Sequence, residues 1–178
     1  MDLAHATHIA DSIIAKLSPF CERAMKCGSI RRRKQEVSDI DIVVIPKRDQ
    51  VRDMFQNPTG WVVIPEFVAV VNQWTKVKGE PYGKMTSRLF EGHKVELYMA
   101  DEDNFGAITL IRTGDSDFTH MIMKRVNQCG LEQRDGYLWK SGQKISTPTE
   151  QDYFRIINLP YVEPQNRDAN AFKRLSSR

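Results

Sequence analysis

Cysteine is scarce in this sequence, and its three residues have no spacing typical of a metal site. Cys21, Cys27 and Cys129 are odd in number, so they indicate free thiols in a reducing compartment rather than a disulfide framework. No apolar run approaches the length of a membrane-spanning helix, and the N-terminus lacks the apolar segment of a secretory signal. These absences predict a cytoplasmic protein with no membrane partner.

Size and charge narrow the function classes without choosing among them. The chain has 178 residues, of which 40% are hydrophobic and 28% charged, as in an ordinary soluble protein with one compact unit or two small lobes. Its net charge of +3 is compatible with nucleic-acid binding without requiring it. Basic residues gather in a run over 31–34 and in a C-terminal tail with Lys173, Arg174 and Arg178. No heptad repeat is present, so we expect a monomer.

Two aspartates separated by one residue open the most informative stretch. Asp39 and Asp41 lead directly into an apolar run over 42–46. Alternate side chains of a strand share a face, so both carboxylates point the same way while Ile40 and Val44 point into a core. Two carboxylates on one rigid strand repel each other, and divalent cations between them relieve that repulsion. The stretch therefore predicts a magnesium site.

The segment before the aspartates has the chemistry of an anion site. Gly28 and Ser29 allow backbone amides to approach an anion closely, and Arg31 and Arg32 follow in what we expect to be the first turn of a helix. Unpaired amides and the helix dipole favour phosphate there. A nucleoside triphosphate carrying Mg²⁺ suits both halves. The simpler interpretation is a solvated turn beside a charged surface. It does not explain why the anion-binding segment and the two aspartates lie so close together in the sequence.

Periodicity and turn residues predict the elements around this stretch. An amphipathic helix is expected over 3–17, capped by Asp2 and ended by Pro19. We expect Trp61 and Trp74 to pack in the core, and the polar tail from residue 168 to fray. The other expected elements are strands over 21–27 and 39–46, a helix over about 48–56, a turn over 57–60, an apolar stretch of undecided type over 67–74, strands over 75–78, 84–90 and 94–99, a helix after a cap at Asp101, a helix over 116–129 ended by Gly130, a hairpin over 131–140 and a helix from 150.

The strand over 94–99 supplies a third carboxylate. Val95, Leu97 and Met99 form its core-facing set, so Glu96 projects from the opposite face. Lys94 precedes Glu96 by two residues and shares that face. The alternation by itself fits an exposed glutamate on a strand.

The combination resembles the signature of the DNA polymerase beta superfamily of nucleotidyltransferases, and specifically the family X DNA polymerases. The matching motifs are Gly-Ser-x-Arg-Arg at 28–32, Asp-x-Asp at 39–41, Thr-Gly at 113–114 followed by Phe118, and Tyr-x-Glu-Pro at 161–164. The resemblance extends from the first helix to Arg167. It implies an α+β fold with a nucleotidyltransferase palm, a mixed sheet flanked by helices, over 1–104 and a small C-terminal α/β thumb over 105–178.

The resemblance implies a DNA-directed DNA polymerase that adds deoxynucleotides to a primer 3′-hydroxyl by two-metal phosphoryl transfer and releases pyrophosphate. Asp39, Asp41 and Glu96 would be its catalytic residues and the ligands of two Mg²⁺ ions, for which Mn²⁺ can substitute. The family usually has Asp at the third position, and Glu is one methylene longer. The implied partners are a DNA primer–template or gapped duplex and a dNTP.

The same resemblance assigns binding roles to further residues. Arg31 is expected to face the thumb and to form an ion pair with Glu150 that follows closure of the two lobes. The DNA-binding residues would be Lys94, Lys124 and Arg125. The nucleotide-binding residues would be Gly28, Ser29, Arg32, Ser38, Arg112, Thr113, Gly114 and Ser116.

Departures from the family pattern modify the expected activity. Ile111 and Arg112 stand where the family has an aromatic pair, which predicts weak sugar discrimination and acceptance of rNTPs. Met123 falls where an arginine is common, which predicts low fidelity. The chain begins at the palm, without the family's lyase and helix-hairpin-helix regions, and resembles minimal members found among viruses. Gap filling in DNA repair without deoxyribose-phosphate lyase activity is the expected function.

Two alternatives stay open. One is a nucleotidyltransferase that works without a template, tailing a nucleic-acid end or modifying another acceptor, which the missing aromatic pair and the missing arginine favour. The other is a DNA-end binding protein whose catalysis has decayed, with Glu96 in place of Asp as the trace of that decay.

Overall fold

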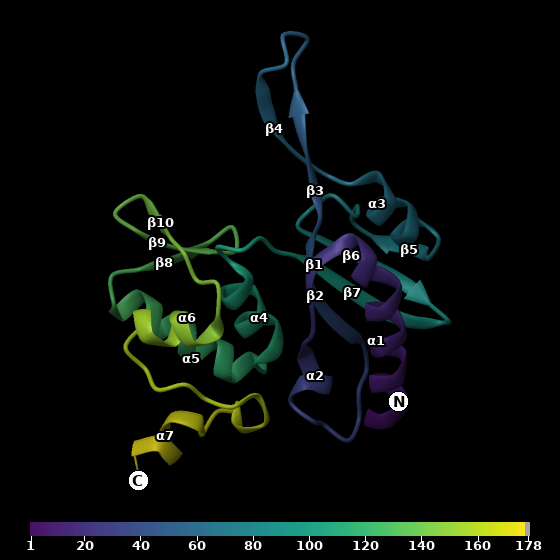
Figure 1. Cartoon of the computed structure of the whole chain (residues 1–178). Coiled ribbons are helices and arrows are strands. Elements are labelled where there is room, and N and C mark those ends of the chain that lie inside the picture. Colours follow the sequence, from purple (N-terminus) through teal and green to yellow (C-terminus); the bar gives the residue numbers. More distant parts are fainter. Residues whose placement is uncertain (177–178) are drawn as a thin grey trace.

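The N-terminal lobe is built on a mixed sheet of five strands. In the computed structural model, which describes residues 1–176, the spatial order is β1-β2-β7-β6-β5 (Figure 1). β2 and β7 pair in parallel and the other neighbours are antiparallel. The predicted β1–β2 pair and the predicted meander of three strands are confirmed. The strands are β1 (Cys21–Lys26), β2 (Ile40–Pro46), β5 (Thr75–Lys78), β6 (Met85–Phe90) and β7 (His93–Met99).

Two helices, α1 (Leu3–Leu17) and α3 (Pro65–Asn72), cover one face of this sheet. α1 confirms the predicted amphipathic helix, and Asp2 caps it by accepting a hydrogen bond from a first-turn amide. α3 decides the type of the apolar stretch that the sequence left open. Its residues Phe67 and Val71 lie one turn apart and are fully buried in the core under the sheet.

Alternate residues of β2 and β7 belong to two different cores. Tyr98 lies in the core on the far side of the sheet from α1, with Val43 and Phe105. Glu96 is two residues from Tyr98, and the two side chains are hydrogen-bonded to each other. They therefore lie on the same face of the sheet. The predicted orientation of Glu96 away from the main core is therefore confirmed. The strand residues that pack in the core with α1 and α3 are Ile40, Ile42, Val44, Val95, Leu97 and Met99.

A hairpin replaces the helix predicted directly after β2. β3 (Arg48–Arg52) and β4 (Pro58–Val63) pair antiparallel and project from the body of the lobe (Figure 1). The predicted helix and the turn predicted behind it are both wrong, because every residue of β3 is exposed and no core selects a helical period there. The turn is built by Asp53, which accepts hydrogen bonds from the amides of Phe55 and Asn57.

The two tryptophans of this lobe have opposite environments. Trp74 is 8% exposed and packs edge to face on Phe90, so its prediction as a core residue is confirmed. Trp61 is 66% exposed on β4, so the same prediction for Trp61 is wrong. Trp61 is part of β4, and the β3–β4 hairpin projects from the body of the lobe (Figure 1).

The C-terminal lobe has a core of its own in which helices pack against a small sheet with the order β10-β9-β8. The predicted helices and the predicted hairpin of β8 and β9 are confirmed, and β10 was not predicted. Thr149 and Asp152 form a capping box at the start of α6. The elements are α4 (Phe105–Thr113), α5 (Ser116–Gln128), β8 (Glu132–Arg134), β9 (Tyr137–Lys140), β10 (Gln143–Ile145) and α6 (Glu150–Ile156). The division of the chain after residue 104 stays a prediction.

Of two predicted helix ends, the one at Gly130 is confirmed and the one at Asp101 is wrong. Gly130 has a φ of +68° just after α5, as expected of a residue that ends a helix. Asp101 is not the cap of α4, because that position belongs to Asn104. Asp101 instead accepts hydrogen bonds from the amides of Asp103 and Asn104 and shapes the loop before the helix.

Over its described residues, 168–176, the polar tail is folded, so the prediction that it frays is wrong there. After a short 3₁₀ turn, η2 (Pro164–Asn166), the chain forms α7 (Ala171–Ser176). Ala171 is buried, and the ring of Phe172 stacks on that of Phe118, so these two apolar residues attach the tail to the C-terminal core. Arg178 lies outside the described residues.

Two expectations from composition can be compared with the structure. The cysteines are free thiols, as predicted, and two of them, Cys21 and Cys27, are buried. Within the described residues, no helix combines the length and the apolar composition that crossing a bilayer requires.

The remaining elements of the N-terminal lobe are a 3₁₀ turn, η1 (Ser18–Phe20), and a single helical turn, α2 (Gly28–Arg31).

Candidate active site

The structure brings the three predicted catalytic carboxylates together where β2 and β7 lie side by side. The parallel register places Asp41 directly opposite Glu96, and neighbouring strands in a sheet are about 4.8 Å apart. Asp39 comes two residues before Asp41, directly before the strand begins at Ile40. The amine of Lys94 joins the outer two, with its Nζ 2.6 Å from Glu96 Oε1 and 3.7 Å from Asp39 Oδ2.

Lys94 supplies one of the positive charges at this site, and Arg32 and Arg112 supply others. The hydrogen bond of Lys94 to Glu96 raises the pKa of the amine and outweighs the opposing effect of burial. Among residues 1–176, no three His, Cys, Asp or Glu side chains are gathered closely enough to hold a metal ion. The carboxylates therefore share one face of the sheet without forming a closed set of ligands.

Asp41 is the most perturbed of the three carboxylates. Burial raises its pKa to about 7, and the negative charges of Asp39 and Glu96 add to the effect. Near neutral pH a proton or another cation is needed beside Asp41, because the surrounding charge opposes ionisation. Oxygen ligands in this electrostatic setting suit a hard divalent cation.

Tyr98 belongs to the site although it was not among the predicted residues. Its hydroxyl donates a hydrogen bond to Glu96, and its ring lies under the guanidinium of Arg112, whose Cζ is 4.1 Å from the ring centroid. Burial raises the pKa of Glu96, but the hydrogen bonds from Lys94 and Tyr98 outweigh it and lower the pKa overall. The alternation of Lys94, Glu96 and Tyr98 on one face of β7 is the signal that could have identified Tyr98.

Gly28 is a glycine because the carboxylate of Asp41 lies against its α-carbon. A β-carbon at this position would lie 1.9 Å from Asp41 Oδ2, and the φ of Gly28 is +55°. The amide of the preceding residue, Cys27, donates to the Asp41 carbonyl at 2.8 Å. The turn at Gly28 is therefore fitted directly onto the strand that carries the aspartates.

The residues predicted to hold phosphate lie between the two lobes. Arg32 donates to Ser29 Oγ at 3.3 Å and to the backbone carbonyl of Thr113, and its Nε finds no partner among the described residues. Ser38 Oγ lies 3.1 Å from Asp39 Oδ1. Arg32 thus joins the Gly-Ser turn to the end of α4 and keeps one buried donor available for an anion.

The Thr-Gly segment connects α4 to α5. Thr113 is buried at the end of α4 and accepts a hydrogen bond from Arg31 at 2.8 Å. A β-carbon on Gly114 would lie 2.8 Å from the Phe118 ring, so the close turn requires glycine. Ser116 is the first residue of α5. Arg31 also forms the predicted ion pair with Glu150, which is confirmed.

The predicted DNA-binding residues differ in their contacts and in their exposure. Lys94 is bound to the carboxylates, and Lys124 is exposed on α5. Arg125 donates from Nε to the Ile157 carbonyl at 2.9 Å and from Nη2 to the Asn158 carbonyl at 3.4 Å. Two of its donors therefore hold the end of α6, and its contact with DNA stays a prediction.

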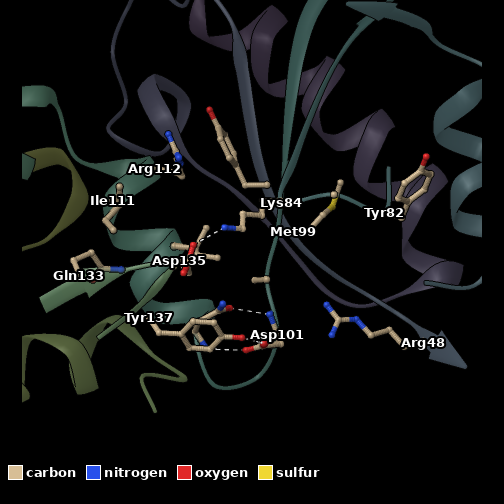
Figure 2. A pocket seen from close by; sticks show the side chains of 16 residues that line it. Arg48, Tyr82, Lys84, Met99, Asp101, Ile111, Arg112, Gln133, Asp135 and Tyr137 are labelled. Atoms are coloured by element: carbon tan, nitrogen blue, oxygen red, sulfur yellow. Dashed lines mark hydrogen bonds and ion pairs between the residues drawn. The ribbon is translucent and has the colours of Figure 1, made fainter. Parts of the chain in front are cut away.

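A cavity of about 710 Å³ lies beside the carboxylates, between β7, α4 and the β8–β9 turn (Figure 2). It shares Tyr98 and Arg112 with the site. Sequence reasoning missed its other polar residues, because they meet only in the folded chain. Lys84 pairs with Asp135 at 2.5 Å, and the Tyr137 hydroxyl donates to Asp101. These missed lining residues include Arg48, Tyr82, Lys84, Asp101, Gln133, Asp135 and Tyr137.

Comparisons with known proteins agree with this architecture. Residues 108–168 match the family model described as the DNA polymerase beta thumb. DNA polymerase lambda of Rattus norvegicus is 23% identical over 160 residues, which cover 80% of this chain and 28% of the relative. The chain thus spans well under half the length of that curated relative.

A solved structure is similar over nearly the whole chain. Polymerase beta of Leishmania infantum, solved as a ternary P/T complex, superposes with a TM-score of 0.71 at 16% identity. The match covers 94% of this chain and 76% of the other. This likeness confirms the predicted α+β fold, and together the comparisons confirm the predicted resemblance to family X polymerases.

Proposed function

We propose that this family X polymerase-like chain is a DNA polymerase that adds deoxynucleotides to a primer 3′-hydroxyl and releases pyrophosphate. The observation that carries the proposal is the convergence of Asp39, Asp41 and Glu96 on one face of the sheet, beside Arg32. The similar proteins are named as DNA polymerases, and one of them was solved as a ternary P/T, or primer–template, complex. These names support a primer–template and a dNTP as partners.

The donor set suits Mg²⁺. Carboxylate oxygens are the ligands that this ion prefers, and the raised pKa of Asp41 reflects a site where negative charge is not fully balanced. Asp39 and Asp41 would hold two ions, and Glu96 would join them at one. Bound there, Mg²⁺ or Mn²⁺ would polarise phosphate oxygens and acidify the attacking hydroxyl.

The side chains of this chain would perform the positioning. Tyr98 holds Glu96 by a hydrogen bond, which fixes a side chain one methylene longer than aspartate. Glu96 would assist loss of the primer hydroxyl proton. Lys94, once released from the carboxylates, would contact the primer phosphate. Arg32, with Ser29 and Ser38, would hold the terminal phosphates of the nucleotide, and the buried Arg32 Nε has a donor available for that contact.

Two segments expected to lie near the nucleotide favour low fidelity and weak sugar discrimination, and gap filling would be the activity that they serve. Ile111 and Arg112 provide no aromatic ring before Thr113, and Arg112 lies on Tyr98 of the palm sheet. Met123 on α5 is packed against the C-terminal core and offers no hydrogen-bond donor to a base pair. Without such contacts, discrimination would depend on base pairing alone.

Primer extension on a gapped duplex tests the proposal. Each templating base is offered in turn with dNTPs or rNTPs, and with Mg²⁺ or Mn²⁺. We expect incorporation that follows the template and falls at least about 100-fold in Glu96→Gln. Glu66→Gln is the matched control, because it makes the same chemical change on the exposed face of α3.

The same assay discriminates the alternatives. Incorporation that ignores the templating base would support a template-independent nucleotidyltransferase. DNA-end binding with no extension under any metal condition would support a protein whose catalysis has decayed. Extension by Glu96→Gln at the wild-type rate would contradict the proposed roles of the carboxylates.

A further inference from the structure

The β3–β4 hairpin concentrates the exposed hydrophobic side chains of the described residues. Five of the eight large ones lie on it, namely Val51, Met54, Phe55, Trp61 and Val62. Met54 is 86% exposed and Phe55 77% at the tip, and Trp61 is 66% exposed on β4. Exposed aromatic side chains gathered on one projecting element are typical of an interaction surface.

The two faces of the hairpin differ in charge. The register places Gln50 opposite Trp61, and the side chain of Arg52 donates to Gln50 Oε1 at 2.6 Å. Arg48, two residues before Gln50, lies on the same side of the strand. Asp49 and its partner Val62 lie on the opposite side. We call the side with Arg48, Gln50, Arg52 and Trp61 the tryptophan face.

No carboxylate neutralises the tryptophan face. Asp53, at the turn, accepts hydrogen bonds from the amides of Phe55 and Asn57 and from the Asn57 side chain. Among the described residues, the recorded ion pairs include neither Arg48 nor Arg52. The tryptophan face therefore combines an exposed indole with two positive charges.

The hairpin begins where the catalytic strand ends. A single residue, Lys47, separates β2 from β3, and Arg48 lines the cavity beside the carboxylates (Figure 2). From that base the five residues of β3 extend about 17 Å from the lobe (Figure 1). A polymer held near the carboxylates can therefore continue along the hairpin.

We propose that the tryptophan face binds an unpaired segment of the DNA substrate, with Trp61 stacking on a base and Arg48 and Arg52 near phosphates. The proposal rests on the proposed function, which supplies the DNA. An indole between uncompensated arginines matches a single strand, because every base has a π-face and every nucleotide carries a negative charge. The absence of a carboxylate on this face favours a polyanion over an acid-rimmed protein partner.

Binding measured without metal or nucleotide separates this surface from catalysis. Fluorescence anisotropy of a labelled primer–template with a long single-stranded template extension is compared with that of a blunt duplex. We expect Trp61→Ala to weaken binding of the extended substrate about tenfold and to leave the blunt duplex nearly unaffected. Trp61→Phe should retain most of the affinity, because a smaller aromatic ring still stacks.

The matched control is Val62→Ala, a change at another exposed hydrophobic residue on the opposite side of the same hairpin, which should leave binding unaltered. Arg48→Gln should reduce the slope of log affinity against log salt by about 0.7, the value for one phosphate contact on a single strand. Single-stranded DNA should also quench the wild-type tryptophan fluorescence more than that of Trp61→Phe. Circular dichroism checks that each variant is folded.

Equal binding of the extended substrate by Trp61→Ala and wild type would overturn the proposal. So would an equal loss in Val62→Ala, or a dimer in sedimentation that depends on Trp61, which would indicate a protein interface. Extension by wild type together with unchanged binding in Trp61→Ala would reject this inference alone. Binding that depends on Trp61 together with no extension would reject the proposed polymerase activity alone.

Discussion

The guanidinium of Arg31 donates to both carboxylate oxygens of Glu150, at 2.8 and 2.6 Å, across 119 residues of sequence. Glu150 also accepts a hydrogen bond from Arg167 at 2.6 Å. Glu150 is 5% exposed, Arg167 1% and the Arg31 side chain 18%, so the three form an ionic network whose centre is buried. The network joins the turn after Gly28 to the C-terminal lobe. Its relation to lobe closure stays a prediction.

Removing the charge of Glu150 should destabilise the fold. Burial raises the pKa of Glu150, but hydrogen bonds from Arg31 and Arg167 outweigh it and lower the pKa overall. Glu150→Gln leaves two arginines close together without a counter-charge, and we expect a loss of about 3 kcal/mol in urea denaturation. Glu132→Gln, on exposed β8, is the control.

The same pair can be tested by reversing its charges. A double variant, Arg31→Glu with Glu150→Arg, should not recover full stability, because Arg167 would then face a like charge. If the two single changes have independent, additive effects on the extension rate, Arg31 and Glu150 do not act as a pair in the reaction.

Because the folded pKa of Glu150 is lowered, its stabilisation should be present at neutral pH and should be lost as the pH falls below about 4.

Asp41 should make the metal-free protein less stable at high pH. Its pKa of about 7 in the folded protein exceeds the unfolded value, so the folded state holds a proton that the unfolded state releases. Stability is then full below about pH 4 and declines as the pH rises through 7. With EDTA present, Asp41→Asn should be about 3 kcal/mol more stable than wild type at pH 8 and similar at pH 4. Equal stabilities at both pH values would contradict the burial of a destabilised carboxylate.

Lys94 should compete with divalent cations for the carboxylates. Its amine lies 2.6 Å from Glu96 and 3.7 Å from Asp39, where it balances their charge. Lys94→Met should therefore bind Mn²⁺ about tenfold more tightly in calorimetry and should be less stable without metal. Lys140→Met, an exposed lysine change on β9, should alter neither property. Weaker Mn²⁺ binding in Lys94→Met would show that the amine does not oppose the ion.

Gly28→Ala should damage both folding and activity. The φ of +55° costs a side chain about 1–2 kcal/mol, and the new β-carbon would meet Asp41 Oδ2 at 1.9 Å. The carboxylate must then move, so extension should fall by more than the stability loss explains. Gly130→Ala has a similar φ of +68° with nothing within 4 Å, so it isolates the backbone cost. Equal activities of the two variants would contradict the contact with Asp41.

Local patterns predicted much of the fold because they record local physical demands. The helix over Leu3–Leu17, its Asp2 cap and the alternation that turns Glu96 away from the main core can all be read from spacing. The Arg31–Glu150 pair was predicted through the family resemblance, and the structure contains it.

The errors fall where burial does not constrain the pattern. The segment after β2 has no core to pack against, so its residues admit both a helical and a hairpin interpretation. Trp61 was assigned to a core on hydrophobicity alone, although its neighbours in space are the exposed residues of β3. The tail was expected to fray because it is polar and basic. The contact between Phe172 and Phe118 that holds it joins residues far apart in the sequence.

The amino-acid sequence by itself determined that the two aspartates are spaced to share a face and that Glu96 lies on the face of β7 away from the main core. Both depend on the two-residue period of a strand. Only the tertiary structure decided that Lys94 and Tyr98 hold Glu96 and that Asp41 rests on Gly28. The projection of the hairpin beyond the lobe is likewise a tertiary fact. Such contacts depend on which strands become neighbours, and burial of the whole chain selects that arrangement.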